Sequence, residues 1–214
     1  MIIAVDGPAA SGKGTLAAGL AEHFRLPHLD TGLLYRAVGL ASAAFIGQPD
    51  FEVRAEAAAK ALDTSHLDAK ILGTAEAAVL AARVARIEPV RAALRQFQRE
   101  FAQQPGGAVI DGRDIGTRIC PDADVKLFIT ADTGVRAARR AAQLNARGRQ
   151  VEAAEIQQQI AARDESDRNN PAGAFYLAAD AHLLDTTRLD IEAALRAAVA
   201  IVDAAMARKA GLTP

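Results

Sequence analysis

Several residue types are scarce in this chain, and each scarcity excludes a class of protein. The 214 residues include no tryptophan and one cysteine, Cys120. A single cysteine excludes an internal disulfide framework and is typical of a reducing compartment. Because no neighbouring histidine supports a reactive thiolate, we expect Cys120 to be a small, buried apolar side chain.

A charge excess and a long apolar run are also absent. The chain has 25 Lys and Arg against 26 Asp and Glu, a formal net charge of −1, so no global basic field indicates a nucleic-acid partner. Charges interrupt every alanine-rich stretch before it reaches membrane-spanning length. Met1 leads directly into an apolar segment, and we expect no signal or transit peptide before it. We therefore expect a soluble, cytoplasmic protein without nucleic-acid or membrane partners, and we expect a monomer.

A glycine-rich turn near the start of the chain is the most informative feature that is present. Ile2–Val5 is a short apolar run typical of a buried strand, and Leu16 and Leu20 begin an apolar helical stripe. The residues between them read GPAASGKGT. Strand, glycine-rich turn and helix in this order are the context of a phosphate-binding loop. The alternative is a chance glycine turn in a chain rich in Ala and Gly.

The chemistry of this loop suits a nucleotide phosphate group. Backbone N–H groups at a helix start point at one place, and the helix dipole adds partial positive charge there. Gly7 and Gly12 permit backbone geometry that a Cβ would hinder, and Lys13 supplies a full charge to the outer phosphates. The strict pattern has Ser or Thr directly after the lysine, whereas Gly14 intervenes here. The GKGT ending resembles the loop of the adenylate kinases and related nucleoside-monophosphate kinases, which implies that the Thr15 hydroxyl lies near Mg²⁺. The predicted ATP-binding loop consists of Gly7, Pro8, Ala9, Ala10, Ser11, Gly12, Lys13, Gly14 and Thr15.

Apolar runs alternate with helical patterns along the chain, which predicts an α/β fold with a parallel sheet wrapped by helices. The candidate strands are Ile2–Val5, His28–Leu29, Ala108–Ile110, Val125–Ile129 and His182–Leu184.

The predicted core is interrupted by two inserts. Residues 47–104 are the least α/β-like part, and we predict a small helical lobe there. Leu80, Val84 and Ile87 mark one helix, which Pro89 interrupts. A helix break precedes the second insert, residues 148–163. The predicted core domain consists of residues 1–46, 105–147 and 164–214.

Charged residues follow two of the other predicted strands. Asp111 and Arg113 come after the third strand, and ligands of open α/β sheets bind beyond such strand ends. We predict that Asp111 holds Mg²⁺ through water and that Arg113 binds a phosphate with its bidentate fork. The alternative is a turn with a surface salt bridge between Arg113 and Asp114. The four histidines show no ligand spacing, so a catalytic metal would arrive with the nucleotide.

The segment after the second predicted strand is ambiguous. Arg36 would start from the same edge of the sheet, where a second phosphate could bind. The alternative, with nearly equal weight, is that Asp30 or Thr31 only caps a helix.

An arginine cluster occurs later in the chain. Arg136, Arg139 and Arg140 share a helical face. A solvated basic face is the ordinary explanation, but beside a phosphate loop an arginine clamp on the transferring phosphates is favoured. Arg163 and Asp167 lie four residues apart and could form an ordinary surface pair.

Taken in order, GPAASGKGT, LDTGLLYR, VIDGRDIGT, RAARR, and RDESD followed by DAHLLDTT resemble the bacterial cytidylate kinases over nearly the whole chain. The resemblance implies transfer of the γ-phosphoryl group of ATP to CMP or dCMP, with ATP and Mg²⁺ bound. It also implies the adenylate-kinase-like form of the P-loop NTPase fold, a three-layer αβα core. In that fold the first insert is the part that binds the nucleoside monophosphate (NMP), and the second is the lid.

The resemblance also implies roles for single residues. Arg91 and Asp114 would contact the cytosine, Arg113 the acceptor phosphate, and Arg136 and Arg140 the ATP. The full set implied for the acceptor is Thr31, Tyr35, Arg36, Arg91, Arg113, Asp114, Arg163 and Asp167. The implied catalytic residues are Lys13, Arg113, Arg140 and Arg163.

The chain departs from the family pattern at three positions. Family members usually read RDxRDxxR where this chain reads RDESDRNN, so Ser166 and Asn170 stand in place of arginines. Ala82 stands where a serine is common. These changes bear on base selectivity and acceptor affinity, and we hypothesise that Arg168 partly compensates.

The acceptor phosphate needs no general base, because its second ionisation lies at about pH 6. Catalysis should then come from alignment and from positive charge around the transferring group. Two rival functions remain open: a related kinase with another acceptor such as UMP or AMP, and a nucleotide-operated switch. A guanine-specific N/T-K-x-D motif, typical of such switches, is absent.

Overall fold

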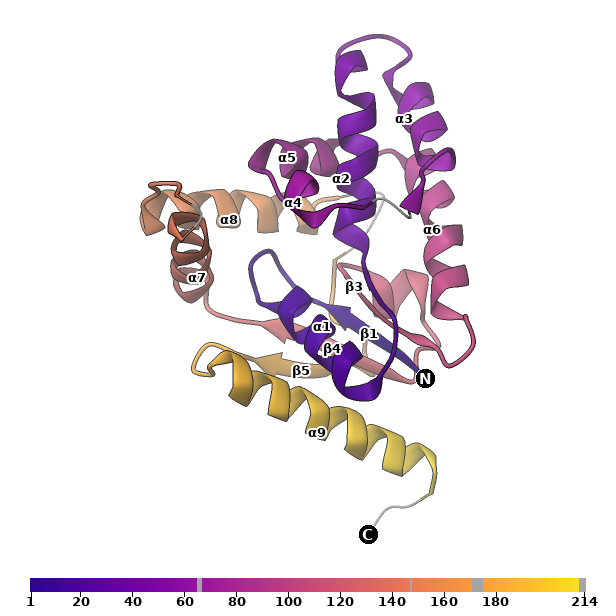
Figure 1. Ribbon diagram of the computed structural model, residues 1–214, viewed down its shortest axis with the longest axis vertical. Coiled ribbons are helices and arrows are strands. Elements are labelled where there is room, and N and C mark those ends of the chain that lie inside the picture. Colours follow the sequence, from indigo (N-terminus) through magenta and orange to yellow (C-terminus); the bar gives the residue numbers. More distant parts are fainter. Residues whose placement is uncertain (65–66, 147, 171–174, 212–214) are drawn as a thin grey trace.

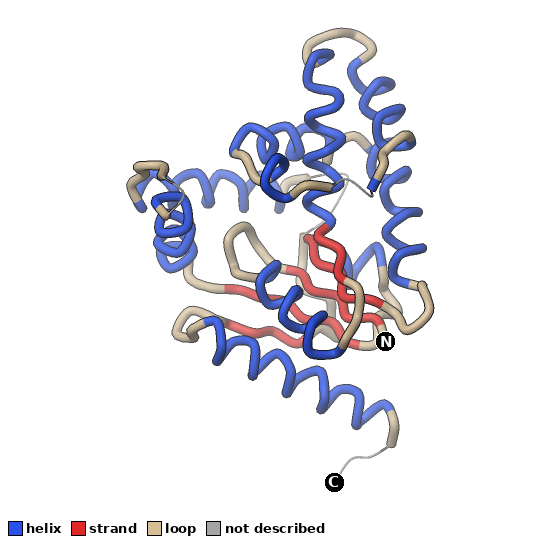
Figure 2. Tube along the Cα trace, viewed as in Figure 1, coloured by secondary structure: helices blue, strands red, loops and turns tan. Residues whose placement is uncertain are grey.

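Five short parallel strands form the centre of the molecule (Figure 1, Figure 2). The computed structural model describes residues 1–64, 67–146, 148–170 and 175–211. The strands are β1 (Ile2–Asp6), β2 (His28–Asp30), β3 (Ala108–Gly112), β4 (Val125–Thr130) and β5 (His182–Asp185). Their order across the sheet is β2-β3-β1-β4-β5, and every neighbouring pair is parallel. The predicted α/β fold with a parallel sheet is therefore confirmed.

The register of the sheet brings three chain segments together at its carboxyl edge. Asp30 of β2 pairs with Asp111 of β3, and Asp6 of β1 pairs with Gly112. Before these positions β1 and β3 are apolar and buried, because helices cover both faces of the sheet. The segments that follow β1, β2 and β3 consequently start side by side.

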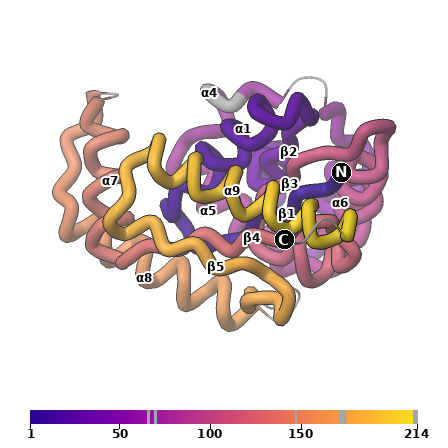
Figure 3. Tube along the Cα trace, turned by 90° about the horizontal axis from the view of Figure 1, so that it is seen from below, coloured from indigo at the N-terminus to yellow at the C-terminus, as the bar shows by residue number. Residues whose placement is uncertain are grey.

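Helices cover the two faces of the sheet and give the fold three layers. The α-helices are α1 (Lys13–Phe24), α2 (Thr31–Ser42), α3 (Phe51–Lys60), α4 (Ala69–Leu72), α5 (Ala75–Val84), α6 (Glu88–Ala102), α7 (Thr133–Asn145), α8 (Ala153–Arg168) and α9 (Ile191–Lys209). The described residues also include a 3-10 turn, η1 (Ala43–Phe45), and a short π-helix, η3 (Ile115–Ile119). Helices α1 and α9 lie together against one face (Figure 3), where Leu20 and Val202 join a cluster with Ile3. On the other face Ile110 belongs to a cluster that includes Leu94 of α6.

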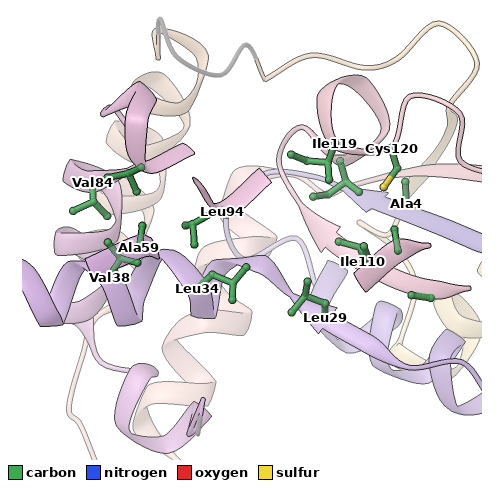
Figure 4. Packing of buried hydrophobic residues seen from close by; sticks show 14 of the residues in the cluster. Ala4, Leu29, Leu34, Val38, Ala59, Val84, Leu94, Ile110, Ile119 and Cys120 are labelled. Carbon is green, nitrogen blue, oxygen red and sulfur yellow. The ribbon is translucent and has the colours of Figure 1, made fainter. Parts of the chain in front are cut away.

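Helices α2 to α6 form a part that extends away from the sheet (Figure 1). Leu34 and Val38 of α2 continue the apolar cluster that begins at Ile110 in the sheet, and Val84 of α5 belongs to the same cluster (Figure 4). The described residues of the predicted first insert are helical and include no strand. The apolar cluster is thus continuous from the sheet into this helical part.

One helix boundary in this part differs from the prediction. Helix α5 ends at Val84, and Ile87 is the N-cap of α6 instead of part of the preceding helix. Pro89 lies in the first turn of α6. Its missing N–H has no intrahelical partner to lose there, and its fixed φ suits a helix start. Pro89 therefore begins a helix and does not interrupt one.

Helices α7 and α8 form a pair beside the sheet (Figure 1). Alanines of α7 pack against Ile156 and Ile160 of α8. Helix α7 ends at Asn145 and Glu152 is the N-cap of α8, which confirms the predicted break between the two helices. Helix α8 then runs without interruption to Arg168, past residue 163.

Cys120 lies in the main apolar cluster and is 7% exposed. The expectation of a buried cysteine is confirmed, and burial raises the pKa of its thiol to about 11, which disfavours the reactive thiolate. Within the described ranges, none of the helices combines the length and the apolar character that crossing a bilayer requires.

Substitution of Leu34 tests how much the apolar cluster between the sheet and helices α2 to α6 contributes to stability. The side chain is fully buried, so Leu34→Ala should lower the free energy of unfolding by about 2–5 kcal/mol, through lost burial and a cavity. Denaturant titration measures the difference. Val53 of α3 is 68% exposed, and Val53→Ala should change the free energy by less than about 0.5 kcal/mol. Equal effects of the two substitutions would contradict the packing described above.

Candidate nucleotide site

The loop between β1 and α1 has the geometry of an anion-binding turn. Gly12, the N-cap of α1, has a φ of +88°, and Ala10 has a φ of +58°. At Gly7 a Cβ would lie 2.2 Å from the carbonyl oxygen of Ile129, so only glycine fits. No side chain of the described residues caps α1, and the buried Ser11 hydroxyl has no hydrogen-bond partner among them. The backbone N–H groups and the helix dipole are therefore free to bind an anion.

Lys13 begins α1 directly after this loop and is half-buried. Its pKa is lowered from 10.5 to about 7, mainly by burial. The charges of Arg113 and Arg163 act in the same direction, and the carboxylate of Asp111 opposes them. The protein thus places a lysine where its charge is costly unless an anion joins it.

Arg36, Arg113 and Arg163 reach the same region from α2, from the end of β3 and from α8. Burial lowers the pKa of Arg163 to about 10, and burial also lowers the pKa of Arg36; repulsion from Arg113 adds to both shifts. Arg36 Nη1 donates to the carbonyl of Leu72 at 2.8 Å. The Nε of Arg163 is buried and has no hydrogen-bond partner among the described residues. Mutually repelling cations at one edge of a sheet favour the binding of phosphate groups.

The ion pairs at this edge are neither the Arg113–Asp114 salt bridge nor the Arg163–Asp167 surface pair that the sequence left open. Arg113 Nε donates to Asp167 Oδ2 of α8 at 2.7 Å. Arg113 therefore does not form a local turn with Asp114, which pairs with Arg91 instead. Asp167 likewise faces Arg113 and is not part of a surface pair within α8. Both pairs connect elements that are distant in the sequence.

Three of the predicted acceptor residues form a buried polar group. Arg91 of α6 donates to the carboxylate of Asp114, and the two residues are 6% and 7% exposed. The Arg91 guanidinium lies 5.9 Å from the ring centre of Tyr35 in α2. Burial raises the pKa of the Tyr35 hydroxyl. This arrangement offers an aromatic ring, a cation and a carboxylate to a flat polar ligand.

The junction of β2 and α2 has a structural role at two predicted positions. The Asp30 carboxylate accepts the backbone N–H of Gly32 at 2.8 Å and caps α2. The Thr31 hydroxyl donates to the carbonyl of Asp111 at 2.8 Å and is 4% exposed. The capping alternative therefore holds for Asp30, and Thr31 links α2 to β3.

The Asp111 carboxylate has a partner that sequence reasoning missed. His28 Nε2 of β2 lies 2.8 Å from Asp111 Oδ1, and the two strands are neighbours in the sheet. The other oxygen faces the start of α1, because a Cβ on Gly14 would lie 3.8 Å from it. Thr15, the predicted hydroxyl for Mg²⁺, is exposed on the first turn of α1. His28 meets Asp111 because of the register between β2 and β3, and that register could not be predicted from the sequence.

The described residues include no group of three or more His, Cys, Asp or Glu side chains that could hold a metal ion. Protein side chains alone would therefore not complete a metal site within this part of the chain. The available donors are oxygens of a hydroxyl and of carboxylates, the ligands that Mg²⁺ prefers. The donor set therefore fits a magnesium ion that also takes ligands from a nucleotide and from water.

The arginines of α7 divide their contacts between different partners. Arg136 is buried, and its guanidinium donates to the carbonyls of Ala9 and Ala131, to the Thr133 hydroxyl and to Asp164 of α8. Arg139 donates to backbone and side-chain oxygens of the segment after β5, whereas Arg140 donates to a glutamine of its own helix. The three arginines therefore have separate partners, and a common clamp on transferring phosphates stays a prediction. Arg136 supports the phosphate loop by donating to the carbonyl of Ala9, which belongs to that loop.

Of the positions at which the chain departs from the family pattern, Ser166 lies in α8, Asn170 follows α8, and Ala82 lies in α5. Asn170 Nδ2 donates to the carbonyl of Ala85 at 3.2 Å, which connects the end of α8 to the turn between α5 and α6. Arg168 is exposed, and its Nη2 lies 3.3 Å from Glu165. Ser166 is half-buried on α8.

The sequence profile of the family described as "Cytidylate kinase" matches residues 3–204. A curated cytidylate kinase of Xanthobacter autotrophicus is 54% identical over 99% of this chain and 100% of the relative. That of Nitrobacter winogradskyi is 51% identical over 97% of this chain and 98% of the relative. Among solved structures, an uncharacterised protein from Eubacterium ventriosum has a TM-score of 0.56 and 16% identity, over 95% of this chain and 98% of that one, a likeness of fold alone.

The costly charge of Lys13 predicts that Lys13→Met stabilises the nucleotide-free protein. The folded pKa of about 7 lies below the ordinary 10.5, so the cost is complete below the folded pKa and declines as pH rises toward the unfolded one. The gain in Tm from Lys13→Met should therefore be larger at about pH 6 than at about pH 9. Thermal unfolding without nucleotide measures it.

Lys60→Met is the matched control for this prediction. Lys60 is an exposed lysine of α3 that pairs with Glu56 one turn away, so its loss should alter Tm little at either pH. A Lys13→Met variant that is less stable than the parent at both pH values would contradict the conclusion that the charge of Lys13 destabilises the nucleotide-free protein.

Proposed function

The chain belongs to the cytidylate kinase family, and we propose that the site described above transfers the γ-phosphoryl group of Mg·ATP to CMP or dCMP, giving CDP or dCDP. The observation that carries the proposal is the meeting of Lys13, Arg36, Arg113 and Arg163 at the carboxyl edge of one sheet. Four cations from four elements suit two phosphate-bearing ligands that face each other.

The donor side consists of the loop Gly7–Thr15. Its uncapped helix start and Lys13 would hold the β- and γ-phosphates of ATP. The unpartnered Ser11 hydroxyl supports this assignment, because a bound phosphate would supply its missing partner. Thr15 and Asp111 would hold Mg²⁺, directly or through water, and the ion would neutralise charge on the phosphates.

The acceptor side consists of the buried group around Arg91 and of the arginines beside it. Tyr35, Arg91 and Asp114 would bind the cytosine, since a carboxylate accepts an amino group and an arginine donates to ring acceptors. Arg36 and Arg113 would hold the acceptor phosphate. Because Arg113 pairs with Asp167, the phosphate would have to compete with that carboxylate.

The acceptor phosphate is already an anion and requires no general base. The residues of the site therefore need only align the two substrates and neutralise negative charge on the transferring group. Lys13, Arg140 and Arg163 would place positive charge around the transferring group. Residues 47–104 would form the NMP-binding part and residues 148–163 the lid, since Arg91 lies in the first segment and Arg163 ends the second. Closure of these parts would exclude water and so suppress hydrolysis of ATP. We also propose a monomer, because one chain supplies both sides of the site.

The substrate assignment is tested by ADP release with CMP, dCMP, UMP and AMP as acceptors. We expect turnover to be fastest with CMP or dCMP. Preference for UMP or AMP would show a related kinase with another acceptor. Slow nucleotide hydrolysis that no monophosphate accelerates would indicate a switch and would overturn the proposal.

The role of Arg113 is tested by Arg113→Met, assayed with saturating CMP and Mg·ATP. Removal of one charge that stabilises the transferring group should lower kcat by about 10²–10³. Arg196→Met is the control, because Arg196 is an exposed residue of α9 in a helix pair with Glu192. Similar kcat values for the two variants would exclude Arg113 from the transfer step.

A further inference from the structure

Asp6 is a buried carboxylate that neither the phosphate loop nor the acceptor residues account for. It ends β1 and is 6% exposed. Its Oδ1 accepts the backbone N–H of Ile115, and its Oδ2 accepts that of Gly116, each at 2.8 Å. Both donors belong to the first turn of η3, which begins directly after Asp114. The side chain therefore connects the end of one strand to the segment that follows another.

Burial of the Asp6 carboxylate has an unfavourable desolvation free energy, which its hydrogen bonds have to offset. Burial raises the pKa of its carboxyl to about 6, and the N–H groups of Gly116 and Ile115 oppose the shift. A buried carboxylate is destabilising unless hydrogen bonds compensate it. The approach is also close, because a Cβ on Gly116 would lie 3.4 Å from Asp6 Oδ2 and 3.1 Å from a side-chain carbon of Lys126.

The two ends of the Asp6 contact belong to the two sides of the site. Asp6 immediately precedes Gly7, the first residue of the phosphate loop. Its acceptor oxygens hold the segment that follows Arg113 and Asp114. The backbone pairing of β1 with β3 ends at Gly112, so the carboxylate extends the connection beyond the last paired residue of the sheet.

The far end of η3 is fixed by a different residue. Arg99 of α6 donates from Nε to the carbonyl of Ile119 at 3.0 Å and from Nη2 to the carbonyl of Arg118 at 2.9 Å. This contact holds the end of η3 that is remote from Arg113 and Asp114. Asp6 therefore holds the end of η3 that adjoins the proposed acceptor residues.

We propose that Asp6 is a positioning residue for the acceptor: by holding the start of η3, it fixes Arg113 and Asp114 relative to the phosphate loop and thereby sets acceptor affinity and base selectivity. The inference rests on the proposed function, since the roles of Arg113 and Asp114 come from it. Asp6 itself contacts backbone N–H groups and is assigned no contact with the reacting atoms.

The test is Asp6→Asn, which keeps the size of the side chain but places an amide donor against one of two N–H donors. Loss of a hydrogen bond to a charged acceptor should raise KM for CMP about tenfold or more. The preference for CMP over UMP should fall as well, because Asp114 is displaced. The Kd for a non-hydrolysable ATP analogue should change less than about twofold, because the phosphate loop has its own contacts.

Asp124→Asn is the matched control. Asp124 Oδ2 accepts the backbone N–H of Ile2 at 2.8 Å, so it also receives an N–H at β1, but at the opposite end of the strand. This substitution should lower Tm while KM for CMP and base preference stay unchanged. A merely structural role of Asp6 would give the same pattern, with no selective rise in KM, and would overturn the inference.

A second variant keeps the inference testable if Asp6→Asn does not fold. Gly116→Ala adds a methyl group at the start of η3, 3.1 Å from the Lys126 side chain and 3.4 Å from Asp6 Oδ2. A shift of η3 away from Lys126 would lengthen the hydrogen bonds to Asp6, so this variant should also raise KM for CMP more than it alters binding of the ATP analogue. Unchanged KM for CMP in folded Gly116→Ala protein would overturn the inference. Failure of the parent enzyme to phosphorylate CMP would overturn the proposed function instead, so the parent assay separates the two failures.

Discussion

Repulsion between cations at one edge of the sheet is the constraint on which the rest of this structure depends. Burial lowers the pKa values of Lys13, Arg36 and Arg163, and repulsion from the charge of Arg113 adds to each shift. These side chains would separate if the backbone allowed it. A parallel sheet prevents this separation, because it sets the starts of α1, α2 and the segment after β3 side by side. The fold thus holds positive charge in place before any ligand binds, which is electrostatic preorganisation.

Carboxylates around this edge neutralise only part of the charge. Asp167 pairs with Arg113, and Asp111 opposes the shift in Lys13. Asp111 is in turn shared with His28. Complete neutralisation would stabilise the free protein but would leave nothing for an anion to bind. The site therefore follows the common pattern in which function is retained at a cost in stability.

Helix α8 connects the two sides of the site through residues three positions apart. Asp164 pairs with Arg136, which also holds the phosphate loop at the Ala9 carbonyl. Asp167 pairs with Arg113 at the end of β3. The position of α8 is therefore coupled by ion pairs to Arg136, which holds the loop before α1, and to Arg113 after β3. Arg163 precedes this pair of carboxylates, so its placement depends on the same contacts.

Local patterns in the sequence were sufficient for the strands and for the turn that precedes α1. The apolar runs predicted all five strands, and the order of strand, glycine-rich turn and helix predicted the phosphate loop. The meeting of Lys13, Arg36 and Arg113 followed because parallel strands end at one edge. Helical spacing was less reliable at Ile87, where a proline that suits a first turn began the next helix.

Pairing partners were decided by the tertiary structure alone. Arg113 and Asp114 are adjacent in the sequence, yet their partners, Asp167 and Arg91, come from α8 and α6. The contacts of His28 and Asp6 depend on strand register and on the path of η3. A sequence shows which charges exist and which element carries them. Whether two charges meet is a matter of distances between elements, and only the packing of the whole chain sets those distances.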